Sequence, residues 1–564
     1  MKYLPKRKSG ERKSGERKNG EMKSKERKKR QEWITTIGLV SYLIGLLMRI
    51  PLGRIIGDKG VGFFAAGMEI FIISIIILSY GLSKSVAILI KYRVKREMYK
   101  SARRVFRSAL FLAVISGAVA ACGIFFFSEG IAQVAVLEDM SYLAIAAAAP
   151  AVFLSAVMGV LKGYFQGIGT MMPTIHSKLL EKVIMFASSL ILGAVLYTYG
   201  LKVAALLKSE EYASAYGAFG ASLGIGIACL FAALHLLFIY AIYAGSFKQQ
   251  IGKDGGKYAE SGAEVLIMLI TTSLPYTICA LLYSMNYLVD QRLFNYAMNV
   301  KGQGSLRVLN WGIYYGKYSV VIGSAAILCT LSVIGAIPRI AQLFDRQDYR
   351  AVQEEMGKSI HQLAVISIPC AVLIAVLAEP IAELLFTGET KTAIRLIQAG
   401  TAVVVLFSFT YFLAGILQRI RKIQIVILGG LAAFILHLAV TILLLGNTGL
   451  GITAVVCGNI VFYLTACGVC FFGVIRYMKY SQEWIRTFAI TLIAAGISGL
   501  IGMLLNKALL SFAGAAVTLI ICAVACFVAY NVLLIVLRGV RQEELSGMPG
   551  GKLIVTIAVR LHLM

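Results

Sequence analysis

The sequence predicts an all-α polytopic membrane protein of about 14 transmembrane helices, arranged as two six-helix lobes in a parallel pseudo-repeat plus two C-terminal helices. Composition is the first reason: 59% of the 564 residues are hydrophobic, whereas soluble domains are about 45–50% apolar. Distribution is the second, because many of the apolar runs exceed the roughly 18 residues that indicate a membrane span. A β-barrel would instead show short strands of alternating polarity. The third is a repeat between the two halves.

The expected spans follow from the apolar runs in chain order. They lie at residues 33–55, 62–90, 107–128, 141–161, 179–200, 216–245, 264–290, 317–338, 360–386, 397–417, 424–446, 451–475, 487–506 and 510–537. The first run begins near Trp33 and is too long, with flanks too polar, for the apolar core of a secretory signal. We therefore expect it to be retained as the first span.

Two pairs of similar stretches carry the repeat. Met98–Ser116 resembles Asp348–Ser367, both ending in LAVIS, and Gly159–Lys162 resembles Gly415–Gln418. Because six is even, both halves enter the membrane in the same sense, and such parallel repeats enclose a midplane site in many transporters. The expected division is a tail at 1–32, an N-lobe at 33–245, a cytoplasmic linker at 246–263, a C-lobe at 264–475, two helices at 476–537 and a cytoplasmic segment at 538–564.

The net charge of +27 is distributed in a way that indicates membrane topology and argues against a nucleic-acid partner. Basic residues concentrate in the low-complexity tail and in residues 91–107, whereas the next loop has Glu129, Glu138 and Asp139 and no Lys or Arg. The positive-inside rule then places both termini in the cytoplasm of a cell-membrane protein. The tail lacks apolar residues to bury, so we expect it to be disordered and to attract anionic lipids.

One loop departs from this alternation of charge. Residues 291–316 are expected to be external, yet they carry Arg292, Lys301 and Arg307. Such a loop could meet an anionic headgroup, or its charge could be without functional meaning.

Arg49 is the first candidate site residue, because it lies at the end of the first apolar run, two residues before Pro51. A lipid-facing arginine is costly, so such a residue usually turns toward a water-filled cavity or an anionic partner. The alternative is that its long side chain reaches the outer headgroups. The first interpretation predicts a cationic cavity lining for an anionic substrate.

Other polar residues within the runs are further candidates. Substrate-binding candidates beside Arg49 are Arg54, Lys84 and Glu69; coupling or gating candidates are Asp290, Asn286, Glu181 and Gln166. Glu69 could instead pair with Lys59 or Arg54, and Asp290 with Arg292 or Arg307. Asn286 and Asp290 lie at i and i+4, on one face of a helix, where a carboxylate could couple protons or bind a cation.

Several kinds of chemistry are not expected. His235, His361 and His437 lack ligand spacing and are interpreted as packed or interfacial histidines. The ten cysteines all lie in apolar runs, so no disulfide, metal site or cofactor is expected. No Walker A motif is present, so the driving force would be an ion gradient, the membrane potential or the substrate gradient.

Three stretches resemble a known family: RIPLGRIIGDKGVGFF at Arg49–Phe64, LSYGLSKSVAILI at Leu78–Ile90 and LKGYFQGIGTMMPTIHSKLLEK at Leu161–Lys182. They are similar to the stage V sporulation protein B and polysaccharide-biosynthesis group of the multidrug/oligosaccharidyl-lipid/polysaccharide exporter superfamily. In the third stretch Lys162, Lys178 and Lys182 replace an arginine and two glutamines of the usual pattern.

The resemblance implies a flippase for undecaprenyl-pyrophosphate-linked sugars, with lipid II or a related cell-wall precursor as substrate. It also implies two six-helix lobes, a central cavity and alternating access, and it places Arg49, and less closely Arg54 and Lys84, among cavity-lining cations. A monomer is expected. The alternatives are a cation-coupled multidrug exporter of the same superfamily, and a membrane enzyme or a non-transporting scaffold of cell-wall assembly.

Overall fold

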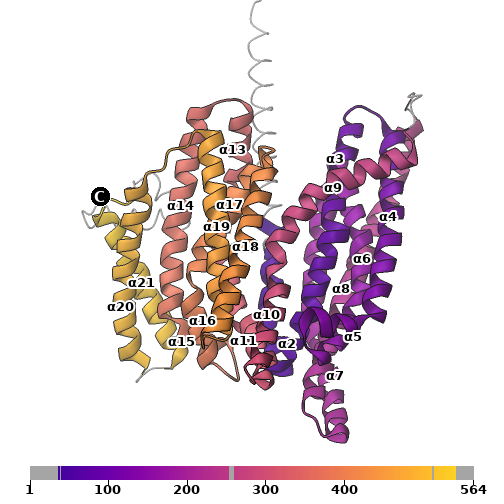
Figure 1. The fold of residues 1–564 in the computed structure, drawn as a ribbon. Helices are drawn as coiled ribbons and strands as arrows, with labels where there is room; N and C mark the ends of the chain where they lie inside the picture. Colours follow the sequence, from indigo (N-terminus) through magenta and orange to yellow (C-terminus); the bar gives the residue numbers. More distant parts are fainter. Residues whose placement is uncertain (1–35, 39, 253, 255–259, 511–513, 541–564) are drawn as a thin grey trace, which may run out of the picture.

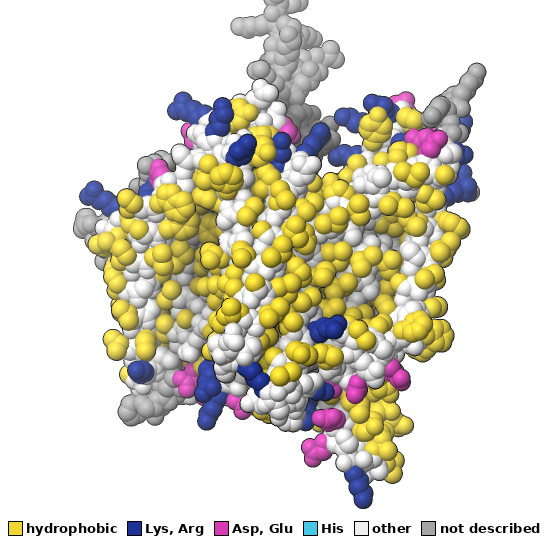
Figure 2. All heavy atoms as spheres, viewed as in Figure 1, with side chains coloured by type: hydrophobic (Ala, Val, Ile, Leu, Met, Phe, Trp, Pro, Cys, Tyr) yellow, Lys and Arg dark blue, Asp and Glu magenta, His cyan; other side chains and the backbone are white. Residues whose placement is uncertain are grey.

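The computed structural model describes residues 36–38, 40–252, 254, 260–510 and 514–540, and these residues are helical apart from short turns (Figure 1). By length and composition they contain 12 helices that could cross a membrane, or up to 13 if one bent pair forms a single span. Figure 2 shows a broad belt of hydrophobic side chains between two ends that carry charged ones. The chain is thus a multi-pass membrane protein of the predicted class, although the predicted number of fourteen spans is not confirmed.

Part of the difference between the expected and the observed number of spans comes from Thr36–Val94. This stretch of 59 residues counts as one candidate span, but it contains a break. Helix α2 (Arg49–Ile75) is interrupted at Gly57, whose φ of 73° and ψ of 171° are not helical. A Cβ built on Gly53 would contact Val61, although eight residues of straight helix rise about 12 Å. The chain therefore reverses at Gly57, where glycine adopts a positive φ without steric cost.

The first bundle consists of α2 and the helices that follow it. These are η1 (Ile76–Tyr80, a π-helix), α3 (Gly81–Val94), α4 (Tyr99–Phe126), α5 (Ser128–Ile131), η2 (Ala132–Val136), α6 (Tyr142–Gly167), α7 (Met172–Leu207) and α8 (Glu211–Gly252). Helix α6 is the buried centre of this bundle, packed against α2, α3, α4 and α8. Small residues allow these close approaches: a Cβ on Gly163 would collide with Val86.

The second bundle lies beside the first in Figure 1. It contains α11 (Arg307–Ile313), η5 (Tyr314–Tyr318, a π-helix), α12 (Ser319–Leu331), α13 (Ala336–Asp345), α14 (Tyr349–Val376), α15 (Ala378–Leu385), α16 (Lys391–Gly400), α17 (Ala402–Arg419), α18 (Ile423–Asn447) and α19 (Ile452–Met478). Helices α20 (Ile490–Leu510) and α21 (Ala515–Val536) pack on each other at the outer side of α14.

Helices α9 (Gly262–Ser284) and α10 (Asn286–Val300) connect the two bundles. Helix α9 packs on α3 and α4 in the first bundle and on α18 in the second. Residues 291–316 do not form the single loop that was expected, because α10 extends to Val300 and α11 begins at Arg307, and their external location stays a prediction. Helix α10 buries a polar face, including Gln291 and Asn295, against its neighbours.

The two bundles are built as the repeat predicts, but in a different register. Helices α4 and α14 each have 28 residues and follow a residue with positive φ, Glu97 or Gln347. This equivalence sets an offset of 250 residues, so the matching LAVIS letters, 251 apart, are displaced by one position. Buried positions agree in the structural register: Ala102 with Val352, Phe106 with Met356, and Ala113 with Leu363.

The second pair of similar stretches is displaced by one helical turn. Helices α6 and α17 both end in a turn with a positive-φ residue, at Gly169 and Arg421. In both turns that residue donates its N–H to the carbonyl three residues earlier, Gln166 or Gln418. The structural counterpart of Gly415–Gln418 is therefore Gly163–Gln166, and not Gly159–Lys162 as the letters indicated.

Candidate functional site: a basic cavity between the bundles

A cavity of about 910 Å³ lies between the two bundles. It is lined by helices of both, and it extends from Arg49 to Lys91 and Arg419. We call the end of the molecule that carries Lys91, Arg93, Arg104 and Arg419 the basic end, and the opposite end the far end. The charged lining residues are Arg49, Glu69, Lys84, Lys91 and Arg419. Four cations against one carboxylate give the cavity wall an excess of positive charge, which attracts anions.

Aromatic hydroxyls supply most of the remaining polarity. Ten of the lining residues are tyrosines: Tyr42, Tyr80, Tyr276, Tyr283, Tyr287, Tyr314, Tyr315, Tyr318, Tyr411 and Tyr463. A tyrosine offers an apolar ring and one hydroxyl that donates or accepts a hydrogen bond. Such a wall suits a large head group that carries hydroxyls and amides.

Arg49 points inward and reaches the second bundle. Its guanidinium donates to the carbonyl of Tyr315 at 3.1 Å, to the hydroxyl of Ser319 at 3.0 Å and to the hydroxyl of Tyr315 at 2.8 Å. The same group lies 3.7 Å above the centre of the Tyr315 ring. The side chain does not reach toward headgroups, since Arg49 is only 8% exposed. In this conformation it closes the deep end of the cavity.

The other expected substrate-binding residues divide into two groups. Glu69 and Lys84 line the cavity with Arg49. Local pairing of Glu69 is excluded, because Glu69 is buried, Lys59 pairs with Glu211 and Arg54 donates to the carbonyls of α15. Arg54 does not line this cavity, so its role in substrate binding stays a prediction.

Polar contacts join the two bundles at the far end, and we refer to them as the far-end closure. Lys317 of η5 forms an ion pair with Asp58 of α2 at 2.8 Å and donates to the carbonyls of Thr387 and Glu389. Arg307 pairs with Glu138 at 2.6 Å. Opening this end would therefore uncover paired charges, of which Lys317 and Asp58 are at most 9% exposed.

The Glu138 carboxyl of this closure lies outside the spans and is buried. Burial raises the pKa of Glu138 above its ordinary value, although the hydrogen bond and charge of Arg307 lower it. The Arg307–Glu138 pair is therefore partly desolvated. Replacing either residue alone would leave the other buried without its partner.

The coupling candidates Asn286 and Asp290 lie on one face of α10, and both are buried. Asp290 contacts His437 of α18, with Oδ1 and Nε2 2.7 Å apart and both side chains fully buried. The alternative of pairing with Arg292 or Arg307 is therefore wrong, and His437 is more than a packing residue. Among the described residues, Asp290 Oδ2, Asn286 Oδ1 and Thr441 Oγ1 have no hydrogen-bond partner.

Glu181 and Gln166 lie in the first bundle. Gln166 lines the cavity near the basic end. Glu181 of α7 accepts from Lys162 at 3.2 Å and pairs with Lys182 at 3.4 Å.

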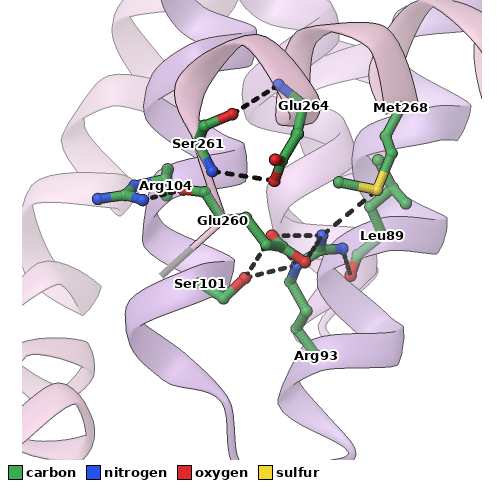
Figure 3. Close-up of polar contacts among 8 residues, drawn as sticks. All are labelled: Leu89, Arg93, Ser101, Arg104, Glu260, Ser261, Glu264 and Met268. Atoms are coloured by element: carbon green, nitrogen blue, oxygen red, sulfur yellow. Dashed lines mark hydrogen bonds and ion pairs between the residues drawn. The ribbon is translucent and has the colours of Figure 1, made fainter. Parts of the chain in front are cut away.

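A separate cluster fixes the start of α9 to the first bundle, shown in Figure 3. Arg93 of α3 donates to both carboxylate oxygens of Glu260, each at 2.7 Å, and Ser101 of α4 donates to the same group at 2.8 Å. Arg104 donates to the Glu260 carbonyl. Ser261 and Glu264 then form a reciprocal capping box at the helix start, which satisfies backbone donors that would otherwise be unpaired.

Sequence reasoning missed three of these features. The partner of Asp290, the Asp58–Lys317 pair and the Glu260 cluster all join residues more than 140 positions apart. A signal existed only for Lys317, a lone cation in an apolar run.

Fold and cavity define a two-bundle membrane protein of the kind that moves a solute between two faces of a membrane. Comparison with known proteins agrees. A family model described as "Polysaccharide biosynthesis protein" matches residues 29–298. Stage V sporulation protein B of Bacillus subtilis (strain 168) is 22% identical, over 92% of this chain and 97% of that protein. Lipid II flippase MurJ of the same organism is 23% identical, over 70% and 73%.

Solved structures share the fold. Lipid II flippase MurJ in an inward closed conformation has a TM-score of 0.63 at 13% identity, covering 89% of this chain and 97% of that chain. An inward-facing multidrug resistance MATE family transporter of the MOP superfamily has a TM-score of 0.57 at 15% identity, covering 78% and 95%. The predicted family resemblance is confirmed by these relatives, and the solved structures show that the chain shares their fold.

Proposed function

We propose that this protein is a flippase that moves undecaprenyl-pyrophosphate-linked cell-wall or polysaccharide precursors across the cytoplasmic membrane by alternating access. The observation that carries the proposal is the charge of the cavity, in which Arg49, Lys84, Lys91 and Arg419 face a single carboxylate, Glu69. Guanidinium and ammonium groups are the donors that best hold a pyrophosphate. The tyrosine-rich wall would accommodate the sugar head, while the polyprenyl chain stays in lipid.

The lining supports this substrate class over cationic drugs. A multidrug exporter for cations would favour carboxylates in the cavity, but Glu69 is the single lining acid among the described residues and has Arg49 close by. In the proposed orientation the basic end is cytoplasmic, following the positive-inside rule. The conformation is then one in which the substrate enters from the cytoplasm and the far-end closure seals the outside.

The test is transport by purified protein in proteoliposomes with a fluorescent polyprenyl-pyrophosphate-linked sugar. Arg49→Ala is expected to reduce flipping at least tenfold, because several charge-assisted contacts disappear and each is worth about 1.5–3 kcal/mol. Arg350→Ala is the matched control, since Arg350 is a surface residue with a 92% exposed side chain. Full activity of Arg49→Ala would remove Arg49 from the mechanism. Normal cell-wall assembly with no flipping by the wild type would favour the scaffold, and turnover of the precursor would favour the enzyme.

We further propose that Asp290 and His437 couple transport to a proton or another cation. The support is their 2.7 Å contact in a fully buried site beside unpartnered oxygens, since intramembrane ionisable groups of this kind mark ion pathways. Asp290→Asn is expected to make flipping insensitive to an imposed pH or sodium gradient while substrate binding persists. A variant that still responds to either gradient would exclude Asp290 from coupling.

A further inference from the structure

Three lysines surround the Glu181 carboxylate at the basic end of the first bundle. Lys162 of α6 and Lys182 of α7 each contact one oxygen of Glu181. The side chains of these two lysines and of Glu181 are between 14% and 21% exposed. Lys178, one turn earlier on α7, is exposed and has no ion pair or hydrogen bond among the described residues. The cluster thus holds three positive charges against one negative charge.

The lysines face the interior of the protein and not the lipid. Consecutive residues of a helix are rotated by 100°, so Lys178 and Lys182 lie on the same face of α7 as Met185 and Ser189. That face is buried, whereas Ile191 on the opposite side is 62% exposed. The exposure of Lys178 is therefore toward an internal space.

This internal space adjoins the central cavity. Tyr42 and Lys84 line the cavity. The charge of Lys182 acts on Tyr42, and the charge of Lys84 acts on Lys178, so Lys182 and Lys178 each lie near a lining residue. A Cβ built on Gly45, three residues after Tyr42, would lie 3.6 Å from the Lys182 side chain.

We propose that Lys162, Lys178 and Lys182 form an anion subsite on the first-bundle wall of the cavity, which receives the phosphate groups of the substrate; this inference rests on the proposed function. In the observed conformation Arg49 donates to Tyr315 and Ser319 and is engaged in closing the far end. Lys162, Lys178 and Lys182 make no contact of this kind among the described residues.

The pairing within the cluster shows how such a subsite works. Glu181 neutralises part of the charge of Lys162 and Lys182 when no ligand is present, which reduces their mutual repulsion. A pyrophosphate then recruits Lys178 first and competes with Glu181 for the other two. Lysine ammonium groups on flexible stems suit a ligand that must later leave. Glu181 therefore weakens binding, and its neutral analogue would bind the anion more tightly.

The experiment measures binding by native mass spectrometry of the full chain in nanodiscs, with polyprenyl pyrophosphate as probe and phosphatidylglycerol as the competing source of phosphate. Lys178→Gln is expected to weaken polyprenyl pyrophosphate binding about tenfold, the loss of one charge-assisted contact. Glu181→Gln is expected to tighten it severalfold. Lys202→Gln is the control, because Lys202 is an exposed lysine toward the other end of α7.

The outcomes separate the subsite from the proposed function. If the wild type binds the probe but Lys178→Gln and Lys202→Gln both match it, the subsite is excluded and the flippase proposal stands. If phosphatidylglycerol competes equally with the probe, the cluster is a membrane-lipid contact and the inference is overturned. If the wild type does not bind the probe at all, the proposed substrate class itself fails. Lys178 has no partner to lose, so its variant remains informative even if Glu181→Gln does not fold.

Discussion

At the scale of single residues, the cost of burying charge explains both what was predictable and what was not. The inward direction of Arg49 follows from that cost alone. Its partner Tyr315 lies 266 positions later, and no local pattern identifies it. The same holds for His437, which lacks metal-ligand spacing in the sequence because its partner is a single carboxylate on another helix. Single-residue predictions therefore identified the groups that need a partner but not the partner.

Glu260 is the residue whose titration has the clearest consequence. Burial would raise the pKa of Glu260, but hydrogen bonds from Arg93 and Ser101 and the charges of Arg93 and Arg104 outweigh it, so its pKa is lower than its ordinary value. A carboxylate with a lowered pKa stabilises the folded form above its ordinary pKa, and that stabilisation is lost as the pH falls through the lowered value.

We therefore expect Glu260→Gln to loosen the start of α9 at neutral pH. Hydrogen exchange of the amides that begin α9, corrected for intrinsic rate, should be about tenfold faster, since a hydrogen bond to a charged group is worth about 1.5–3 kcal/mol. The exchange rate of the wild type should approach that of the variant as the pH falls below the ordinary glutamate pKa. Glu264→Gln is the control, because its amide oxygen still accepts from the Ser261 N–H. Equal exchange in all three proteins at neutral pH would show that the cluster does not hold α9.

At the scale of helices, α10 shows why a boundary was missed. Charged Arg292 lies on its exposed face, whereas Gln291 and Asn295 are buried. Polar residues on the buried face destroy the hydrophobic periodicity by which helices are recognised. Helix α18 (Ile423–Asn447), in contrast, was predicted to within one residue at each end, as 424–446, whereas α7 (Met172–Leu207) extends beyond the expected span 179–200 at both ends.

Helices α18 and α19 make a prediction about packing beside the Asp290–His437 pair. A Cβ on Gly458 of α19 would collide with Thr441 and approach His437 at 3.1 Å. Gly458→Ala is therefore expected to push the two helices apart and to lower the free energy of unfolding by about 1–3 kcal/mol, the usual cost of overpacking.

Gly468→Ala on the same helix is the matched control for Gly458→Ala. Nothing lies within 4 Å of its Cβ position, and alanine has the better helix propensity, so its stability should be unchanged or slightly higher. Thermal unfolding of the purified proteins checks both. A Gly458→Ala protein as stable as Gly468→Ala would mean that α18 and α19 do not pack this closely.

At the scale of the whole molecule, composition and the internal repeat predicted the fold class. The residue-by-residue alignment of the two halves, in contrast, came from the structure. The matching letters LAVIS suggested an offset of 251 residues, but the equal lengths of α4 and α14 and their buried faces give 250. One position on a helix is a rotation of 100°, so identical letters need not occupy identical environments. The cavity could be inferred from the repeat, but the far-end closure depends on contacts between the two bundles that neither half encodes alone.

Alternating access requires that this closure break, which gives a test of the molecule as a unit. Asp58→Asn removes the carboxylate partner of Lys317 and leaves a buried cation, a change that typically costs about 3–5 kcal/mol. The closed far end should be destabilised and the cavity should open there more often. A cysteine at Tyr411, a cavity-lining residue that is 42% exposed, would report the opening through a membrane-impermeant maleimide applied to either face.

In the parent protein we expect the Tyr411→Cys reporter to be labelled mainly from the face of the basic end. Asp58→Asn should raise labelling from the far face severalfold, and Asp58→Asn with Lys317→Gln should raise it less, because no unpaired charge remains buried. Lys59→Gln is the control: its neighbouring pair with Glu211 is 3.8 Å long and nearly half exposed, so it should contribute at most about 1 kcal/mol. The chain without the reporter corrects for its ten native cysteines. Far-face labelling of Asp58→Asn no higher than that of Lys59→Gln would show that the Asp58–Lys317 pair does not hold the far end closed.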